Sequence, residues 1–259
     1  MNYHNGRVAI VTGANSGIGE AIARRLAQDG ATIMLVARNA ASLEAVRNRF
    51  EGDGFKSGWI SIDLGKRGAP AEVIAKTVAT FGHVDILVNC ASLTLSLRFM
   101  EISDQQWDDA FAVKVHGAIR LFREAWPQLK ANKGMVVNIG GIGARTPRAN
   151  RGMTGVLSAA LMAATKIMAD EGLKAGVRVN MINPGTVATP RIMGVLRDRA
   201  RDEGITLDEA MARRLAEISS LRMGHPEDTA NLLAYILSPQ GEMLHGSIID
   251  LDGGSTKGL

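Results

Sequence analysis

The sequence predicts an α/β fold in which one doubly wound sheet of about seven parallel strands carries helices on both faces. Short apolar runs of strand length alternate with longer amphipathic segments along the whole chain. A glycine-rich turn joins the first apolar run to the first amphipathic segment, in the order strand, turn, helix. No repeat, linker or low-complexity stretch divides the 259 residues, so we expect a single domain over residues 1–259.

The first strand and the first helix flank the glycine-rich turn. Val8–Val11 is an apolar run with the length of a buried parallel strand. After the turn, Ile18, Ala21, Ile22 and Leu26 recur at the spacing of one helix face. We therefore expect a helix here that packs against the sheet.

The later segments continue the alternation of strand and helix. Further strands are expected at residues 32–37, 59–62, 84–89, 135–139, 177–182 and 246–251. Further helices are expected at residues 42–50, 69–81, 104–130 with a kink at Pro127, 156–173, and from Pro226 onward. A charged helical insertion spans residues 191–222. In such folds the strands end at one edge of the sheet, and ligands bind there.

Composition and charge exclude several classes of protein. The chain is 46% hydrophobic and 22% charged, which fits a globular domain with a core. Its net charge is only +4 with basic and acidic residues interleaved, so we expect no nucleic-acid partner. No apolar run reaches 18 residues and the first residues lack an apolar signal region, so we expect no membrane partner. A single cysteine, Cys90, fits a reducing compartment, and we expect a cytoplasmic protein.

The glycine-rich turn has the chemistry of a dinucleotide site. Glycines let the backbone turn tightly and approach a pyrophosphate, and the following helix offers free N–H groups and a positive dipole end. The residues predicted to line this site are Gly13, Asn15, Ser16, Gly17, Ile18 and Gly19. The turn therefore predicts nucleotide binding.

Several motifs in this order resemble the short-chain dehydrogenase/reductase family. They are TGANSGIG at 12–19, IDL at 62–64, NCAS at 89–92, NPGTVAT at 183–189 and IDLDGG at 249–254. The resemblance covers nearly the whole chain and implies a Rossmann-type sheet, a nicotinamide cofactor and a small-molecule substrate. It also implies that residues 191–222 form a substrate lid.

The resemblance assigns cofactor contacts to the ends of four strands. It implies that Asp63 and Leu64 flank the adenine and that Asn89 and Ala91 line the ribose side. The loop after the sixth strand would hold the nicotinamide carboxamide, through Pro184, Gly185, Val187 and Thr189.

The end of the second strand indicates which dinucleotide is preferred. Sites that prefer NAD place an acid there for the ribose 2′-hydroxyl, whereas an arginine accommodates a 2′-phosphate. Here that position is Ala37, followed by Arg38, and no carboxylate follows until Glu44. We therefore predict that NADP(H) is preferred, with NAD(H) as the alternative.

The catalytic positions implied by the resemblance are all changed. Reductases of the family use a serine, a tyrosine thirteen residues later, a lysine four residues further, and an asparagine on the preceding helix. Aligned on the motifs, these positions hold Gly141, Thr154, Ser158 and Lys114. The resemblance therefore predicts an atypical active site.

Lys114 is the best substitute among the candidate catalytic residues. The two tyrosines, Tyr3 and Tyr235, lie far from this region of the sequence, and Lys166 lies two helical turns beyond Ser158. The hydroxyls of Thr154 and Ser158 are much weaker acids than a phenol, whereas a buried lysine can act as an acid or a base. A purely structural role of Lys114, in which it binds backbone carbonyls, is the alternative interpretation.

Other polar residues near these positions have both a functional and a structural interpretation. Arg145, Arg148 and Arg151 lie in the loop before Thr154, and either bind an anionic group of the substrate or are solvated. Substrate contacts from Thr94 and Ser96, and a base role for His116, are weaker hypotheses. No cluster of side chains has metal-ligand spacing, so we predict no metal site.

Two classes of function remain open at this stage. The first is an atypical oxidoreductase that acts on a small carbonyl or hydroxyl compound, or a non-redox lyase or hydrolase on the same scaffold. The second is an inactive dinucleotide-binding or regulatory protein. By resemblance, helix pairing predicts a homo-oligomer, either a tetramer or a dimer, that uses the two long helices and the last strand.

Overall fold

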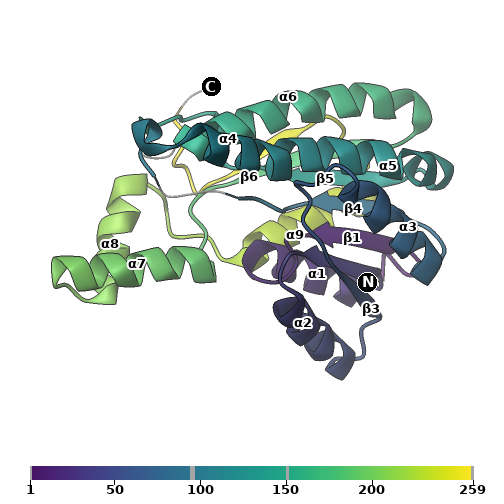
Figure 1. Cartoon of the computed structure of the whole chain (residues 1–259), viewed down its shortest axis with the longest axis horizontal. Coiled ribbons are helices and arrows are strands. Elements are labelled where there is room, and N and C mark those ends of the chain that lie inside the picture. Colours follow the sequence, from purple (N-terminus) through teal and green to yellow (C-terminus); the bar gives the residue numbers. More distant parts are fainter. Residues whose placement is uncertain (1, 94–96, 150–151, 258–259) are drawn as a thin grey trace.

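In the computed structural model, residues 2–93, 97–149 and 152–257 are described, and they contain one sheet of seven parallel strands. The strands occur in the spatial order β3-β2-β1-β4-β5-β6-β7 (Figure 1). Their bounds are β1 Val8–Thr12, β2 Thr32–Ala37, β3 Ser57–Ser61, β4 Ile86–Asn89, β5 Met135–Ile139, β6 Arg178–Pro184 and β7 Ile248–Leu251. The predicted doubly wound α/β fold is confirmed.

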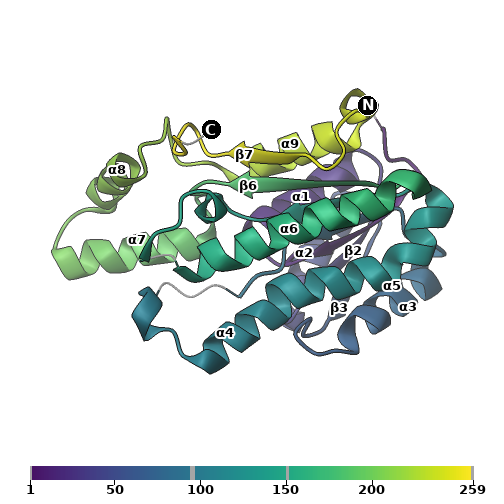
Figure 2. The same cartoon turned by 90° about the horizontal axis from the view of Figure 1, so that it is seen from above.

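Helices cover both faces of the sheet (Figures 1 and 2). One face carries α1 Gly17–Gln28, α2 Ala40–Gly52 and α9 Pro226–Leu237. The other face carries α3 Ala69–Phe81, α5 Gly117–Asn132 and α6 Gly152–Ala175. Each layer has its own apolar core because parallel strands are buried on both sides.

The strand order places a ligand site next to β1. The chain winds outward from β1 to β3 and then returns to the other side of β1 as β4, so the direction of winding reverses between β1 and β4. Parallel pairing brings Thr12 of β1 level with Val36 of β2, and Val11 level with Val88 of β4. A crevice therefore opens beyond the carboxyl ends of these strands, as expected at a switch point of this kind.

The long helix predicted at residues 104–130 is interrupted in the structure. It consists of α4 Asp104–Phe111, a π-helical segment Ala112–His116, and α5, which runs through Pro127. A π segment admits an extra residue into an α-helix and changes the direction of the side chains on either side of it. The helix is therefore interrupted at the π segment that contains Lys114, and α5 continues through Pro127.

The charged insertion forms two helices that project beyond the strand ends (Figures 1 and 2). These are α7 Pro190–Glu203 and α8 Leu207–Ile218. Thr189 caps α7 through its side chain, and Thr206 and Glu209 form a capping box at the start of α8. The two helices pack on each other. They lie beyond the edge of the sheet where ligands bind in this fold.

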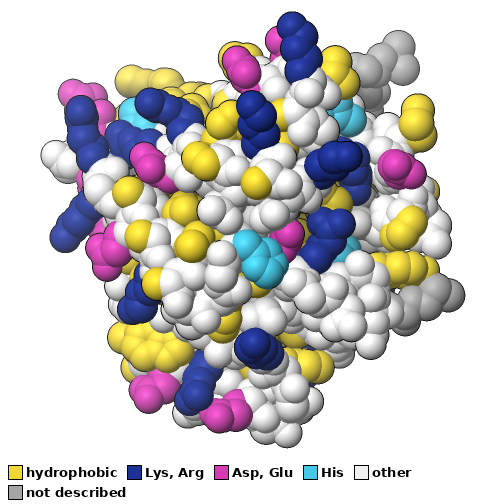
Figure 3. All heavy atoms as spheres, turned by 90° about the vertical axis from the view of Figure 1, so that its right-hand side faces the viewer, with side chains coloured by type: hydrophobic (Ala, Val, Ile, Leu, Met, Phe, Trp, Pro, Cys, Tyr) yellow, Lys and Arg dark blue, Asp and Glu magenta, His cyan; other side chains and the backbone are white. Residues whose placement is uncertain are grey.

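By length and composition, α6 is the one helix in the described ranges that could cross a membrane. Core helices pass the same test, and α6 packs on β6 with Leu157, Leu161 and Met168 buried. On the face of the molecule in Figure 3, Lys and Arg side chains are interleaved with Asp and Glu and form no continuous basic stripe.

Candidate active site

A cavity of about 680 Å³ lies at the carboxyl ends of the strands, between the glycine turn and α7. Cavities of this volume hold small ligands and cofactors. Its wall contains thirteen of the residues predicted for the site, namely Gly13, Asn15, Ser16, Gly17, Ile18, Gly19, Arg38, Lys114, Thr154, Pro184, Gly185, Val187 and Thr189. The structure thus brings together residues that lie up to 176 positions apart in the sequence.

The three glycines of the turn lie where a side chain would be strained or would clash. Gly13 and Gly17 have φ angles of 67° and 57°, which glycine adopts without strain. A Cβ on Gly19 would stand 2.2 Å from the carbonyl oxygen of Gly13. The turn therefore needs glycine at these positions to bring strand, turn and helix together.

The N-terminus of α1 opens into the cavity. Ser16, the N-cap residue, makes no side-chain hydrogen bond to the first turn of the helix. The first N–H groups of an α-helix have no partner inside the helix and attract an anion. The residues at this end therefore fit the pyrophosphate of a dinucleotide.

Arg38 lies at the other end of the glycine turn, after β2. Its side chain is exposed and is part of the cavity wall, and no hydrogen bond or ion pair of its guanidinium occurs among the described residues. Asn15 is held by a hydrogen bond from Nδ2 to Ser42 Oγ of 3.1 Å, which fixes the turn against α2. Arg38 is thus a free cation beside the site predicted for the adenosine ribose.

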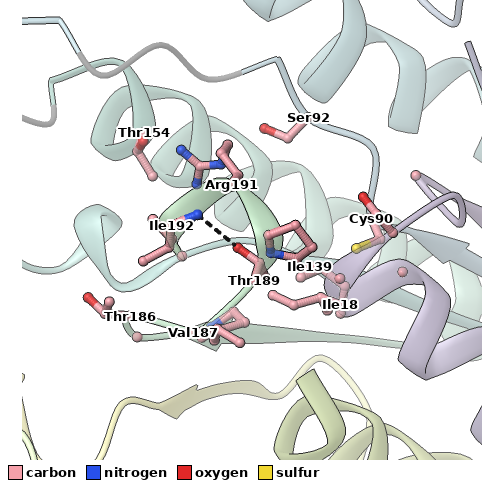
Figure 4. A pocket seen from close by; sticks show the side chains of 18 of the residues that line it. Ile18, Cys90, Ser92, Ile139, Thr154, Thr186, Val187, Thr189, Arg191 and Ile192 are labelled. Carbon is pink, nitrogen blue, oxygen red and sulfur yellow. Dashed lines mark hydrogen bonds between the residues drawn. The ribbon is translucent and has the colours of Figure 1, made fainter. Parts of the chain in front are cut away.

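The loop after β6 forms the opposite wall. The Thr189 N–H donates to Val187 O at 2.7 Å, and Thr189 Oγ1 accepts from the Ile192 N–H at the start of α7 (Figure 4). A Cβ on Gly17 would stand 3.0 Å from Thr189 Cγ2, so this loop meets the glycine turn. The two backbone segments predicted to hold the two halves of a dinucleotide therefore face one another.

Five of the predicted site residues lie outside the cavity wall: Asp63, Leu64, Asn89, Ala91 and Ser158. Asp63 Oδ1 accepts from the Gly65 N–H at 3.0 Å, and Leu64 is buried. Asn89 Nδ2 donates to Asn138 Oδ1 at 2.8 Å, and the N–H of Ala91 donates to Thr12 Oγ1 at 3.0 Å. These contacts hold the strand ends together behind the cavity.

Lys114 enters the cavity from the π segment. Its side chain is only 4% exposed, and Nζ donates to the carbonyl oxygen of Gly140 at 3.3 Å. No carboxylate binds it among the residues that the structure describes. Lys114 is therefore a buried cation held by one neutral acceptor.

Burial governs the acidity of Lys114 and of the neighbouring thiol. The pKa of Lys114 is lowered from 10.5 to about 8, chiefly by burial, with an opposing effect of Cys90 and a smaller lowering effect of the positive charge of Arg191. Burial also raises the pKa of the Cys90 thiol to about 12. Cys90 is therefore neutral near pH 7, and Lys114 can both hold and release a proton near that pH.

Gly141, Thr154 and Ser158 come together beside Lys114. Gly141 has an extended backbone with φ of 172°, and a Cβ built there would stand 3.5 Å from both Thr154 Cγ2 and Ser158 Oγ. Ser158 is fully buried, and its hydroxyl has no hydrogen-bond partner among the described residues. Gly141, Thr154 and Ser158, which the sequence analysis aligned with three catalytic positions of the family, are therefore neighbours in the fold.

The strand end at Gly141 is fixed by a chain of polar contacts. The Gly141 N–H donates to Asn183 Oδ1 at 3.1 Å, and Asn183 Nδ2 donates to Asp250 Oδ1 at 3.0 Å. Arg145 forms an ion pair with Asp250 at 2.6 Å. Arg145, predicted either to bind substrate or to be solvated, instead links the loop after β5 to β7.

The other polar candidates contribute less to the cavity. Arg148 and His116 are exposed and are not part of its wall. Thr94, Ser96 and Arg151 lie outside the described residues. In the described ranges, no three His, Cys, Asp or Glu side chains gather as a metal site.

Helices α7 and α8 lie in the segment predicted as a substrate lid, but the sequence analysis did not assign any of its arginines to the site. Arg191 and Arg199 of α7 and Arg214 of α8 line the cavity, and Arg214 Nη2 donates to Thr186 Oγ1 at 3.4 Å. Arg191 follows the NPGTVAT motif by only two residues, and this proximity was the available signal.

Comparisons with known proteins agree with this architecture. A family profile described as enoyl-(acyl carrier protein) reductase matches residues 13–256. The short-chain reductase protein NovJ of Streptomyces niveus is 32% identical over 251 residues, which is 95% of this chain and 93% of that protein.

Two solved structures are similar along nearly their whole length. L-sorbose reductase of Gluconobacter frateurii, complexed with NADPH and L-sorbose, has a TM-score of 0.95 and 32% identity over 100% of both chains. A short-chain dehydrogenase of Burkholderia cenocepacia in complex with NADP has a TM-score of 0.86 and 28% identity, over 98% of this chain and 99% of that one.

Proposed function

The chain belongs to the short-chain dehydrogenase/reductase family, and from this premise we propose that it is an NADP(H)-dependent oxidoreductase with an atypical proton donor. Its substrate is a small carbonyl compound or the corresponding alcohol. The observation that carries the proposal is Lys114, a buried ammonium inside the cavity that no carboxylate neutralises among the described residues.

The cofactor is held by the two backbone walls and by Arg38. The open N-terminus of α1 fits the pyrophosphate, and the loop 184–189 would hold the nicotinamide. No Asp or Glu of the described residues lines the cavity beside Arg38, so its guanidinium fits a 2′-phosphate. The NADPH and NADP complexes of the two similar structures support this preference.

The bound nicotinamide supplies or accepts a hydride at the substrate carbon. Reduction of a carbonyl also needs a proton at the oxygen, and Lys114 Nζ provides it. The pKa of about 8 lies close to neutral pH, where a general acid works best. In the oxidation direction, neutral Lys114 accepts the proton from the hydroxyl.

The remaining positions of the family's catalytic set do not replace this role. Thr154 presents an aliphatic hydroxyl to the cavity, and Ser158 is buried behind the wall. Neither has a pKa near neutral. We assign Thr154 to positioning the substrate oxygen by a hydrogen bond, and Ser158 to packing.

The first experiment measures cofactor binding and turnover separately. Titration of NADPH and NADH against the quenching of tryptophan fluorescence is expected to give tighter binding of NADPH. Turnover of NADPH is then followed on a panel of small ketones, aldehydes and keto acids. Binding without turnover on any member would favour the inactive binding protein, and substrate cleavage without cofactor oxidation would favour a lyase or hydrolase.

The second experiment tests Lys114 with a matched control. Lys114→Met keeps the length and the apolar stem of the side chain and removes the proton. Loss of a positioned acid costs on the order of 10² to 10⁴ in kcat, whereas NADPH binding should persist. Lys130→Met removes an exposed lysine on α5 and should leave kcat unchanged. Equal kcat in Lys114→Met and in the wild type would remove Lys114 from the mechanism.

The protein is further proposed to form a homo-oligomer through α6. Val156, Ala163 and Ile167 are exposed, and their spacing places them on one helix face. Such a face is suited to packing against a second copy in a closed dimer or tetramer. Light scattering at micromolar concentration should give a multiple of 27.6 kDa, and a monomer mass would contradict this proposal.

A further inference from the structure

The wall of the cavity carries cations and no acids. Five positively charged side chains line it, and no Asp or Glu of the described residues does. The five are Arg38, Lys114, Arg191, Arg199 and Arg214. A protein surface with a nearly balanced composition concentrates charge in this way where it receives an anion.

Not all five cations are available to a ligand. Arg199 binds Glu203 and Glu217, each at 2.7 Å, and Arg214 binds Glu217 at 3.3 Å and Thr186 at 3.4 Å. These two arginines are therefore engaged within α7 and α8 and with the loop after β6. The guanidinium of Arg191 has no hydrogen bond or ion pair in the described part of the chain.

The place of Arg191 in its helix is unfavourable for a cation. It is the second residue of α7, and the first turn of this helix contains no acidic residue. The N-terminal end of a helix carries a partial positive charge, which disfavours Arg and Lys there and favours an anion. An anion beside Arg191 would satisfy both the guanidinium and the helix end.

Arg191 lines the same cavity as the catalytic candidate Lys114. Burial is the main cause of the lowered pKa of Lys114, and the positive charge of Arg191 is a smaller contribution in the same direction. Figure 4 shows the Arg191 side chain on the side of the cavity where Thr154 and Ser92 lie, with the glycine turn and Ile18 on the other side. The two cations therefore share one cavity, and no Asp or Glu of the described residues lines it.

We infer that the substrate carries a carboxylate and that Arg191 binds this carboxylate, next to the carbonyl group served by Lys114. This inference rests on the proposed function and specifies its substrate class. A guanidinium can bind a carboxylate through two parallel N–H donors, which also orients the ligand. A substrate anion at this point would relieve the repulsion between Arg191 and Lys114.

A cofactor phosphate is the other anion that could reach Arg191. The two sources share one chemistry, since phosphate and carboxylate both accept from a guanidinium. The two sources can be told apart, because a contact between Arg191 and a cofactor phosphate would form when NADPH binds without any substrate. Loss of Arg191 would then weaken the binding of NADPH itself. The test therefore measures cofactor binding and carboxylate binding in the same variants.

The test uses the NADPH-loaded full-length protein and isothermal titration calorimetry. The probes are acetoacetate, 2-oxobutyrate and benzoate, each compared with its neutral methyl ester. We expect at least one carboxylate to bind and its ester to bind far more weakly. Arg191→Met should weaken that carboxylate by about 10- to 100-fold, as expected for a charge-assisted contact. Arg191→Lys should retain part of the affinity.

Arg197→Met is the matched control, because Arg197 is an exposed residue of the same helix and is not part of the cavity wall. It should bind the carboxylate like the wild type. Equal binding of acid and ester, no binding of any probe, or wild-type affinity in Arg191→Met would overturn the inference. An equal loss of NADPH affinity in Arg191→Met would assign the arginine to a cofactor phosphate instead.

Turnover is recorded separately from these affinities. If the carboxylate binds through Arg191 but no NADPH is consumed, the proposed oxidoreductase activity fails while the anion site stands. If NADPH is consumed on neutral ketones as fast as on keto acids, the oxidoreductase activity stands and the carboxylate specificity fails.

Discussion

The glycine turn and the loop after β6 line one part of the cavity with backbone, whereas the ends of β5 and α6 and the π segment line another part with side chains. In the first part, Gly13 and Gly17 have positive φ angles that favour glycine, and a Cβ on Gly19 would clash with backbone. In the second, Gly141 leaves open space where a side chain would fit at ordinary contact distances. Close backbone packing therefore restricts which residues fit the first part, whereas the second part has room for other side chains, and on the proposed function its chemistry depends on those side chains.

Rebuilding the second part of the cavity is the strongest way to test this contrast. The quadruple variant Gly141→Ser, Thr154→Tyr, Ser158→Lys and Lys114→Asn restores the set implied by the family. Positioned acid catalysis is worth on the order of 10² to 10⁴ in rate, so we expect a gain of that size on simple ketones. The measurement is NADPH consumption, with Lys114→Asn alone as the control.

The quadruple variant also needs a folding check, because Ser158→Lys places a longer side chain at a buried position. Thermal melting and NADPH titration show whether the cofactor part has survived. A folded, NADPH-binding variant without any gain would show that the two parts are not independent.

Disturbing the first part should have the next largest effect. Gly19→Ala would bring a Cβ within 2.2 Å of Gly13 O, which is backbone and cannot rotate away. Overpacking of this kind costs roughly 1–3 kcal/mol. The turn must move from its binding geometry to remove this clash, so restoring that geometry weakens NADPH binding by up to about 100-fold. Fluorescence titration would measure it.

Gly52→Ala is the matched control for Gly19→Ala. A Cβ at Gly52 would meet nothing within 4 Å, so its NADPH affinity should equal that of the wild type. If Gly19→Ala binds NADPH as tightly as Gly52→Ala does, the turn tolerates side chains and the contrast between the two parts is lost.

Arg38 sharpens the comparison, because it is a side-chain contribution to the backbone part. Arg38→Ala should weaken NADPH by about tenfold, the lower end for a hydrogen bond to a charged group, and leave NADH unchanged. Arg47→Ala removes an exposed arginine of α2 that pairs with Glu51 and should change neither affinity. Equal losses for both dinucleotides in Arg38→Ala would argue against recognition of the 2′-phosphate.

The smallest expected effect is on stability, and it depends on pH. The pKa of Lys114 is about 8 in the folded protein and about 10.5 when the chain is unfolded, so the unfolded state binds more protons between these values. The wild type should therefore gain stability as the pH rises from 8 to 10.5. Lys114→Met should lack this gain and should be more stable at pH 7, by on the order of 1–2 kcal/mol after relaxation around the charge.

Denaturant unfolding at pH 7 and at pH 10 would measure this difference. The Cys90 thiol stays protonated over this range because its pKa is about 12, so it does not obscure the slope. The same slope in the wild type and in Lys114→Met would show that Lys114 does not carry a buried charge.

The order of strands and helices could be predicted from the sequence, because short apolar runs such as Val8–Val11 indicate buried strands. The sequence also predicted where the cofactor motifs meet, since parallel strands all end at one edge. The start of α6 was placed too late, at 156. Gly152 and Gly155 have low helix propensity, which weakened the prediction of a helix there. In the structure Gly155 is helical, and glycine fits because a Cβ at this position would stand only 3.0 Å from Gly143 O.

The sequence places Arg191 next to the NPGTVAT motif, but that its guanidinium is unpaired among the described residues could not be predicted from local pattern. A charged insertion has the same composition whether its arginines face solvent, pair with acids or face a cavity. Only the three-dimensional arrangement shows that Arg199 meets Glu203 and Glu217 while Arg191 meets no acid in the described ranges. Pairing across helices is a tertiary property, and periodicity carries no information about it.

The π segment at 112–116 divides the predicted helix into two halves that serve different partners. In a continuous α-helix, Ala110 and Leu121 would point in nearly the same direction, since eleven residues make about three turns. Here Ala110 packs with Leu157 of α6, whereas Leu121 packs in the core against the sheet. The extra residue of the π segment rotates α5 about the helix axis relative to α4. The direction of the Lys114 side chain therefore depends on this rotation. A sequence alignment gives the position of Lys114 but not this rotation. Deleting one residue from the segment would rotate one helix relative to the other by about 100°.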